Sequence, residues 1–356
     1  MTPLRIAVDA RLWAQTGIGR YVCELCRHLL LVDDGLHLLL MGAPASAAVA
    51  DRAEVVDFSA RPYSLKELLC GGRMAGRYAG RVGLYHYPHY NVPVFSPLPF
   101  VMTVQDLIHF KFPGMFSGLK VGVARKVLRR AARRAARIMT PSESTRNDLV
   151  DMLPWSAEKI DVVPYAASGC FHAGSPEKVE HMKSQRGLDR YILGMCARKP
   201  YKNEGAVIEA FRILSGRHRN LQLVLVGPVA TARQPGICYA GHVSDEELRL
   251  LYCGAECFVF PTLYEGFGLP VLEAMACGCP VVCSTGSSLD EVAGGAALQR
   301  PGRDIEGIAQ ALEGVLESAE LREDLVGRGL ARAASFSWHE TARRALQVYE
   351  RACRSG

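Results

Sequence analysis

Short apolar runs alternate with segments of helical periodicity along most of the chain. In the first half, residues 5–9 and 37–41 have the composition of strands, and residues 19–31 between them place apolar side chains on one helical face. Such alternation is typical of a parallel sheet with helices on both faces. Further strands are predicted in this half at residues 82–87, 100–104, 137–140 and 160–164.

The alternation resumes after residues 164–180, where glycines and prolines predict a linker. The second half has predicted strands at residues 191–195, 221–226, 236–240, 257–261 and 280–283, and predicted helices at 203–214, 245–253, 305–316, 320–333 and 338–353. We therefore expect two α/β domains, residues 1–168 and 169–335, each with a doubly wound parallel sheet. Residues 43–81 follow no clear pattern, and their glycines predict a mobile loop.

The composition is that of a globular protein, with 49% hydrophobic and 22% charged residues among 356. No uninterrupted apolar run reaches the roughly 18 residues of a membrane-spanning helix, and the first residues lack the apolar core of a signal peptide. We therefore expect a cytoplasmic protein. The 12 cysteines are then expected to be reduced, and most are predicted to be small buried hydrophobic residues.

The net charge of +6 is unevenly placed, because residues 120–137 hold many basic residues and no acidic one. The basic residues are Lys120, Arg125, Lys126, Arg129, Arg130, Arg133, Arg134 and Arg137. Apolar residues interleave at helical spacing, which predicts an amphipathic helix. Its basic face is either an ordinary solvated surface or a surface that attracts anionic lipid or a phosphorylated acceptor at the inner face of the cytoplasmic membrane. Nucleic acid is not expected, since no aromatic residues interleave.

The most informative stretch is Glu265-Gly-Phe-Gly-Leu-Pro-Val-Leu-Glu273, with an apolar strand before it and another after it. Its polar groups therefore fall at the carboxyl end of a strand, where open α/β sheets bind ligands. The stretch resembles the Glu-x7-Glu signature of retaining glycosyltransferases, above all glycosyltransferase family four. This resemblance implies the GT-B fold, in which two Rossmann-like domains face a central cleft and a C-terminal helix, here residues 336–356, packs back on the first domain.

The resemblance implies a role for each residue of the signature. Glu265 is expected to contact the hydroxyls of the donor sugar, and Glu273 those of the nucleotide ribose, because a carboxylate offers paired acceptors for a vicinal diol. The backbone amides beside the sugar and phosphates are expected to be those of Gly266, Phe267, Gly268 and Leu269. Leu269 opens a predicted helix, whose dipole favours a phosphate at that end.

Two basic residues, Arg198 and Lys202, follow the first strand of the second half, close to a predicted helix start. The arginine fork and the lysine point charge suit a diphosphate, although ordinary loop charge has the same appearance. The resemblance implies that they neutralise the leaving nucleoside diphosphate. No Asp-x-Asp donor-metal site stands in a matching context, so we expect neither a metal ion nor a cofactor.

A glycine-rich turn with Gly17 and Gly19 separates the first strand from the first helix. Glycines there let backbone N–H groups approach an anion, and a plain tight turn remains the alternative. The resemblance implies that this turn faces the donor diphosphate. In the second half, Ser244 and Glu247 predict a capping box, and the resemblance implies that Val243 contacts the nucleotide base.

The chain departs from the family after residues 100–104, where many members have His-Asp-Leu and this sequence has Gln105-Asp-Leu. The resemblance implies that Gln105 contacts the donor sugar, but glutamine has no titratable ring. His109 is the alternative imidazole, and a structural role stays open for it. Residues 85–91 are polar and aromatic, which suits either sugar binding or a buried aromatic cluster.

Together with these features, the resemblance implies a metal-independent retaining hexosyltransferase. The resemblance is strongest to mannosyl- and rhamnosyltransferases of bacterial polysaccharide assembly, which favours GDP-mannose over a UDP-linked donor. The expected acceptor is a glycan or lipid-linked oligosaccharide in surface polysaccharide or lipopolysaccharide synthesis. Two alternatives stay open, namely a catalytically inactive GT-B scaffold or glycan-binding subunit, and a nucleotide-sugar epimerase.

Overall fold

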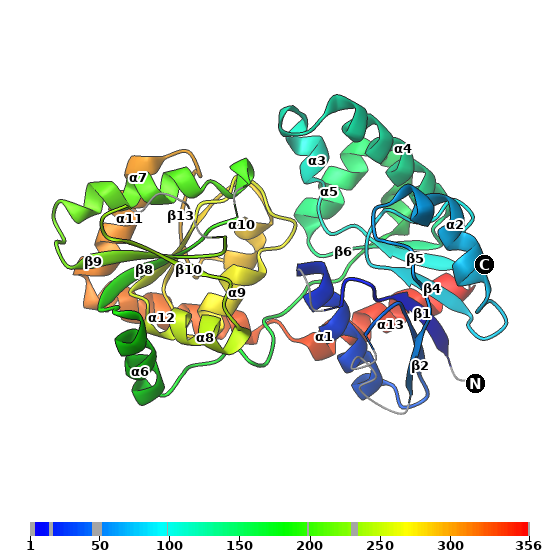
Figure 1. Cartoon of the computed structure of the whole chain (residues 1–356), viewed down its shortest axis with the longest axis horizontal. Coiled ribbons are helices and arrows are strands. Elements are labelled where there is room, and N and C mark those ends of the chain that lie inside the picture. Colours follow the sequence, from blue (N-terminus) through cyan, green and yellow to red (C-terminus); the bar gives the residue numbers. More distant parts are fainter. Residues whose placement is uncertain are drawn as a thin grey trace. The chain divides into compact units, whose positions relative to one another are not determined.

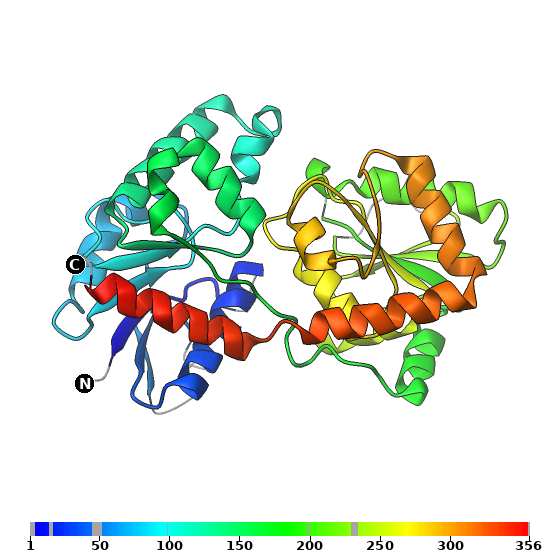
Figure 2. The same ribbon diagram turned by 180° about the vertical axis from the view of Figure 1, so that it is seen from behind.

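The computed structural model describes residues 4–13, 17–44, 52–97, 99–197, 199–228 and 234–354. The chain forms two compact units: Met1–Tyr165 together with Ser337–Gly356 is the first domain, and Ala166–Phe336 is the second domain. The sequence pattern predicted these junctions after residues 168 and 335. Figures 1 and 2 show that each domain is a twisted sheet with helices on both faces.

The first domain is built on a parallel sheet of seven strands in the order β3-β2-β1-β4-β5-β6-β7. The strands are β1 (Arg5–Asp9), β2 (His37–Met41), β3 (Ala53–Val56), β4 (Leu84–Tyr87), β5 (Phe100–Thr103), β6 (Arg137–Thr140) and β7 (Ile160–Val162). Central strands β4 and β5 are buried along their whole length, which explains their continuous apolar pattern. The sequence predicted all of these strands except β3.

The helices of this domain are α1 (Gly17–Val32), α2 (Leu65–Gly76), α3 (Ile108–Lys111), α4 (Gly118–Arg134), α5 (Glu143–Met152) and α13 (Trp338–Arg354). The prediction of a mobile loop over residues 43–81 is wrong where β3 and α2 lie, and residues 45–51 of that range are outside the described residues. Two glycines of α2 have a packing reason: a Cβ on Gly71 would lie 2.8 Å from Pro93 Cγ, and one on Gly72 would meet the backbone of Phe95. The basic helix is confirmed as α4, although Arg137 lies beyond it at the start of β6.

Helix α13 packs on the first domain beside α1, as Figure 2 shows. A buried hydrogen-bonded chain ties it to the sheet: His86 Nδ1 lies 2.9 Å from Tyr349 Oη, and His86 Nε2 lies 2.8 Å from Thr103 Oγ1. Tyr21 Oη continues the chain, 3.1 Å from Thr103 Oγ1. Burial, followed by the charge of nearby His89, lowers the pKa of His86 to about 3. His86 is therefore neutral in the folded protein at neutral pH.

The buried His86 makes stability depend on pH. The unfolded chain takes up a proton near pH 6.5 and the folded protein only near pH 3, so this group destabilises the fold progressively as the pH falls below 6.5. His86→Gln lacks that proton uptake. We expect the stability advantage of the wild type over His86→Gln to shrink by up to about 1.4 kcal/mol per pH unit between pH 6.5 and 4.5, as measured by denaturant unfolding. A difference in unfolding free energy that stays constant over this pH range would contradict the conclusion that the buried His86 is neutral.

The second domain is built on a parallel sheet of six strands in the order β10-β9-β8-β11-β12-β13. The strands are β8 (Arg190–Met195), β9 (Leu221–Val226), β10 (Ile237–Gly241), β11 (Cys257–Phe260), β12 (Val281–Ser284) and β13 (Leu298–Arg300). The helices are α6 (Pro176–Arg186), α7 (Glu204–Ser215), α8 (Asp245–Gly254), α9 (Leu269–Ala276), α10 (Ser288–Ala293), α11 (Ile305–Glu317) and α12 (Ala319–Ala334). The predicted linker is shorter than expected, because α6 already begins at Pro176.

Candidate active site

The chain reverses its winding direction between the neighbouring strands β8 and β11 of the second sheet. Such a switch point opens a crevice at the carboxyl ends of the strands, where α/β proteins bind ligands. The loop after β8 provides Lys202 and the loop after β11 provides Glu265. Lys202 Nζ lies 2.5 Å from Glu265 Oε1, with side-chain exposures of 21% and 14%. These two predicted site residues, distant in the sequence, are therefore brought together.

Two aromatic rings lie close to the ammonium group of Lys202. Its Nζ lies 5.3 Å from the centre of the Phe260 ring and 5.7 Å from that of Tyr201. Aromatic faces attract a cation and displace water around it. A partly desolvated ammonium interacts more strongly with an anion than an exposed one does.

Backbone and side-chain contacts fix these two loops to each other. Asn203, in a left-handed conformation with φ of 59°, donates from Nδ2 to Pro261 O at 2.9 Å and to Gly302 O at 2.5 Å. Leu263 N donates to Tyr201 O at 2.7 Å. The position of Lys202 relative to Glu265 is therefore set by several residues that the sequence analysis did not single out as site residues.

The signature loop ends at the first turn of α9. Gly268 has a φ of 106°, and a Cβ at this position would meet Leu289, so the chain needs glycine here for both conformation and space. Ser288 Oγ donates to Glu265 O and Phe267 O, both at 2.9 Å, which holds the loop in place. Helix α9 begins without a side-chain cap, with Leu269 as its first residue. The N-cap residue Gly268 therefore puts no side chain at the positive end of the helix dipole.

Glu273, the second acid of the signature, lies inside α9 and is only 1% exposed. Contact with a ribose diol requires this buried carboxylate to become accessible. The predicted role of Glu273 therefore stays a prediction. Arg198 and the loop residues 14–16 lie outside the described residues. Gly17 begins α1, Gly19 is buried in its first turn, and their predicted contact with a diphosphate stays a prediction.

In the first domain, Gln105 links three parts of the chain. Its Nε2 donates to Pro88 O at 3.0 Å, and its Oε1 accepts from Tyr165 Oη at 2.6 Å. Within the described part of the chain, these two contacts use one of the two donor positions and one of the two acceptor positions of the amide. His109 lies in α3, with Nδ1 3.4 Å from Tyr90 Oη and its ring 4.4 Å from that of Phe116.

A buried ionic cluster that the sequence did not predict lies at the ends of β1 and β4. It is formed by Asp9, Arg11, Glu67 and His89. Arg11 forms ion pairs with both carboxylates, and its Nε lies 2.8 Å from Asp9 Oδ1. Burial raises the pKa of Asp9, but hydrogen bonds from Arg11 and His89 outweigh it and hold that pKa well below its usual range. No sequence spacing could have signalled this cluster, because Glu67 comes from α2.

Among the described residues, the ligand atoms of Asp9, Glu67 and His89 lie close enough to one another, within 4.8 Å, to hold a metal ion. The guanidinium of Arg11 pairs with both acids and already supplies the positive charge that a metal ion would bring. A second such group, His218, Glu313 and Glu317, is partly exposed. The expectation of a metal-independent protein stays a prediction.

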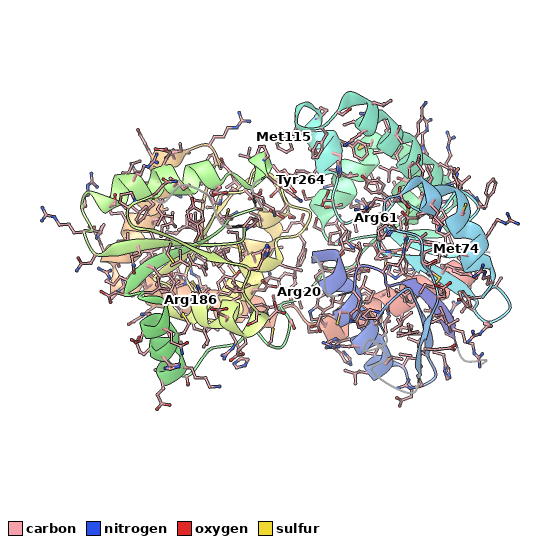
Figure 3. All side chains as sticks on the ribbon, viewed as in Figure 1. Arg20, Arg61, Met74, Met115, Arg186 and Tyr264 are labelled. Atoms are coloured by element: carbon pink, nitrogen blue, oxygen red, sulfur yellow. The ribbon has the colours of Figure 1, made fainter. Side chains whose placement is uncertain are left out.

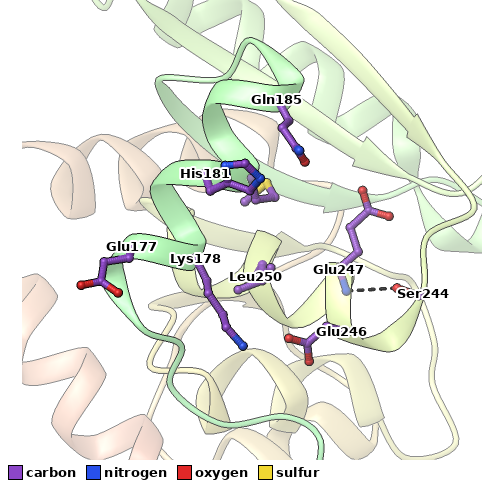
Figure 4. A pocket seen from close by; sticks show the side chains of 9 residues that line it. Glu177, Lys178, His181, Gln185, Ser244, Glu246, Glu247 and Leu250 are labelled. Carbon is purple, nitrogen blue, oxygen red and sulfur yellow. Dashed lines mark hydrogen bonds between the residues drawn. The ribbon is translucent and has the colours of Figure 1, made fainter.

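Val243 is half-buried between β10 and α8. Ser244 caps α8 as predicted, but Glu247 binds Arg186 of α6, labelled in Figure 3, through its side chain. A hollow of about 540 Å³ lies between these two helices, and Figure 4 shows the side chains that line it. None of the predicted site residues lines it.

Comparison with known proteins identifies the family. Residues 15–166 match the family described as Glycosyltransferase Family 4, and residues 178–331 match Glycosyl transferases group 1. The chain is 30% identical to the O-antigen chain mannosyltransferase B of Escherichia coli, over 94% of this chain and 96% of that protein. It is 33% identical to the MMP alpha-(1->4)-mannosyltransferase of Mycolicibacterium hassiacum, over 60% of this chain and 54% of the relative. The chain therefore belongs to glycosyltransferase family 4 and is mannosyltransferase-like.

Solved structures extend the likeness to the fold. The sucrose-phosphate synthase of Thermosynechococcus elongatus has a TM-score of 0.77 at 18% identity, covering 99% of this chain and all (100%) of that one. Anabaena HepE in complex with UDP-glucose has a TM-score of 0.74 at 17% identity, covering 98% of each chain. WaaG, a glycosyltransferase involved in lipopolysaccharide biosynthesis, has a TM-score of 0.71 at 15% identity, covering 97% of this chain and 99% of that one. The predicted GT-B fold is confirmed, and the chain is a glycosyltransferase.

Proposed function

We propose that this glycosyltransferase moves mannose from GDP-mannose, with retention at the anomeric carbon, to a hydroxyl of a glycan or lipid-linked oligosaccharide. One observation carries the proposal: Lys202 and Glu265 meet at the switch point of the second sheet, next to the uncapped start of α9. A cation and a helix N-terminus together suit a diphosphate. The mannosyltransferases among the relatives support mannose as the sugar.

The proposed donor site lies on the second domain. The diphosphate binds Lys202, with Arg198 beside it in sequence, while Glu265 accepts hydrogen bonds from the hydroxyls of mannose. Glu265 forms an ion pair with Lys202. Donor binding therefore exchanges this ion pair for one contact from each side chain to the donor.

In the proposed reaction, the bond between mannose C1 and the diphosphate oxygen breaks, and its electron pair leaves with GDP. An acceptor hydroxyl attacks C1 from the same face, and its proton passes to the departing diphosphate. The charge that develops on the diphosphate is stabilised by Lys202 and the start of α9. No protein carboxylate needs to act as a nucleophile, and no metal ion is invoked in this proposal.

The test is to incubate the protein with GDP-mannose, UDP-glucose, UDP-galactose or UDP-GlcNAc in the presence of mannosyl glycosides and to measure nucleotide release. We expect release from GDP-mannose that is insensitive to EDTA, and an α-linked product by NMR. Release only from a UDP-sugar would refute the donor, and a β-linked product would refute retention. Glycan binding without release from any donor would favour the inactive scaffold, to which the substitution of histidine by Gln105 gives some support.

We further propose that the first domain contacts anionic membrane through α2 and α4. Exposed apolar side chains accompany the basic face: Leu65, Leu69, Phe95, Leu119 and Val123. Arg134 Nη1 donates to Val94 O at 2.6 Å and Val94 N donates to Leu68 O at 2.7 Å, so α4, this loop and α2 form one surface. Apolar side chains and lysine or arginine together favour an anionic bilayer surface. Among the described residues, no helix has the length and hydropathy to span a membrane.

Neutralising exposed charge on α4 is expected to weaken binding to vesicles that contain anionic lipid. Each basic residue near such a surface contributes about 1 kcal/mol, so removing three should lower partitioning at least ~10-fold. The test variant is Arg125→Gln, Lys126→Gln and Arg129→Gln, and the control is Lys178→Gln, Arg219→Gln and Arg303→Gln. Vesicle cosedimentation measures both. Equal partitioning of the two variants would leave α4 as an ordinary solvated face.

A further inference from the structure

The first sheet has a switch point of its own, between β1 and β4. Asp9 ends β1, and His89 follows β4, so the two residues meet at the carboxyl edge where a ligand crevice is expected. His89 Nε2 lies 3.2 Å from Asp9 Oδ2. The ionic cluster therefore occupies, in the first domain, the position that Lys202 and Glu265 occupy in the second.

The other polar groups of the cluster are satisfied within the protein. Glu67 Oε2 accepts from Asn91 Nδ2 and from the backbone N–H of Tyr63, both at 2.6 Å. Arg11 pairs with both carboxylates and donates from Nη1 to Ala60 O at 2.6 Å. Asp9 accepts from Arg11 and faces His89.

One atom differs. His89 is only 4% exposed, and its Nδ1 is buried without a hydrogen-bond partner among the described residues. Buried polar atoms are nearly always paired, so an orphan at a ligand-binding edge of the sheet needs an explanation. The contact to Asp9 uses Nε2 and leaves Nδ1 as the one remaining bonding position of the ring.

Tyr63 covers this histidine in an unusual conformation. Its ring centre lies 5.3 Å from that of His89, and the residue is 58% exposed. Its φ of 60° is rare for a bulky residue, and strained residues of this kind cluster at ligand-binding sites. An exposed aromatic ring beside a buried polar atom offers an apolar face and a hydrogen bond, the combination that a sugar ring needs.

We propose that His89 Nδ1 binds a hydroxyl of the acceptor sugar, with Tyr63 moving to admit it and packing against the sugar ring. A hydroxyl fits because it both donates and accepts, so it pairs with Nδ1 whether or not that nitrogen carries a proton. Asp9 orients the ring through Nε2. This assignment of an acceptor contact rests on the proposed function, since it takes the ligand to be the sugar that receives mannose.

Two substitutions separate the two nitrogens. The amide nitrogen of asparagine stands two bonds beyond Cβ, as Nδ1 does, and that of glutamine stands three bonds beyond, as Nε2 does. His89→Asn therefore keeps a polar group at the ligand position, whereas His89→Gln keeps the contact to Asp9. We expect His89→Gln to weaken sugar binding at least ~10-fold, the loss of about one hydrogen bond to a ligand, and His89→Asn to retain binding within about threefold.

Binding is measured on the full chain by NMR titration with methyl α-mannoside and with the methyl glycosides of glucose, galactose and rhamnose. Wild-type protein labelled with ¹⁵N-histidine gives a second readout, because the Nδ1 resonance of His89 is expected to shift on sugar addition. A folded His89→Gln that binds like the wild type, equal losses in both variants, or an unmoved resonance would overturn the proposal. GDP binding is measured in parallel. If the protein binds GDP but no sugar, only the His89 site is refuted. If it binds sugar but not GDP, only the proposed donor is refuted.

Discussion

Replacing Lys202 with alanine is expected to lower turnover by at least ~100-fold, or about 2.7 kcal/mol of transition-state stabilisation. In the proposed reaction the ammonium faces negative charge that grows as the sugar–phosphate bond breaks, so its removal is expected to lower kcat more than it raises the KM for the donor. Initial-rate assays of nucleotide release against donor concentration measure both constants. Turnover within threefold of the wild type would remove Lys202 from the site.

Two further variants make this result specific. Lys199→Ala removes the same charge three residues earlier, from an exposed side chain whose Nζ lies 5.8 Å from the Tyr201 ring centre, and is expected to cost only a few-fold. Glu265→Gln keeps the shape of the side chain but breaks the ion pair with Lys202. If Glu265 binds sugar hydroxyls, this variant loses turnover although Lys202 is freed for the diphosphate; if Glu265 only restrains Lys202, turnover is retained.

Replacing Arg11 with alanine is expected to lower the free energy of unfolding of the first domain by about 3–5 kcal/mol, because it leaves two buried carboxylates without their cation. Asp9 and Glu67 are 2% and 0% exposed, so water cannot take over the role of Arg11. Thermal or denaturant unfolding measures the effect. The control Arg77→Ala breaks an exposed ion pair, in which Arg77 Nη1 lies 3.8 Å from Asp57 Oδ2, and is expected to cost at most about 1 kcal/mol.

The pH dependence gives the Arg11 result its own check. In the wild type, the lowered pKa of Asp9 stabilises the fold above its ordinary value of 3.8, and this stabilisation is lost as the pH falls below it. Without Arg11, the buried acids instead favour the protonated form, so the folded variant binds more protons than the unfolded chain. The difference in unfolding free energy between the wild type and Arg11→Ala should therefore shrink as the pH falls from 7 to 5. A difference in unfolding free energy that grows over this range would contradict the role of Arg11 as the cation that pairs with the buried carboxylates.

The sequence predicted the elements whose pattern is local. Strands such as β1, β2 and β9 were located to the residue, since a buried parallel strand is a continuous apolar run. Helix α2 was missed because Gly71 and Gly72 lower helical propensity. The helix needs glycine at these two positions because Pro93 and Phe95, elsewhere in the chain, pack closely against them.

The candidate site was predictable only in part. A strand-loop-helix unit was enough to locate Glu265 and Lys202 at the edge of the sheet, and their contact follows from the neighbouring strands β8 and β11. The burial of Glu273 and the hydrogen bonds that occupy Gln105 depend on packing from several elements. The cluster of Asp9 and His89 depends on strand order, which brings β4 next to β1.

The most direct test of the account is a crystal structure of the protein with bound GDP. We expect the diphosphate oxygens to lie within about 2.7–3.2 Å of Lys202 Nζ, beside the first turn of α9, with the ion pair between Lys202 and Glu265 broken. A nucleotide bound elsewhere, for example in the hollow between α6 and α8, with that ion pair intact, would contradict the central claim.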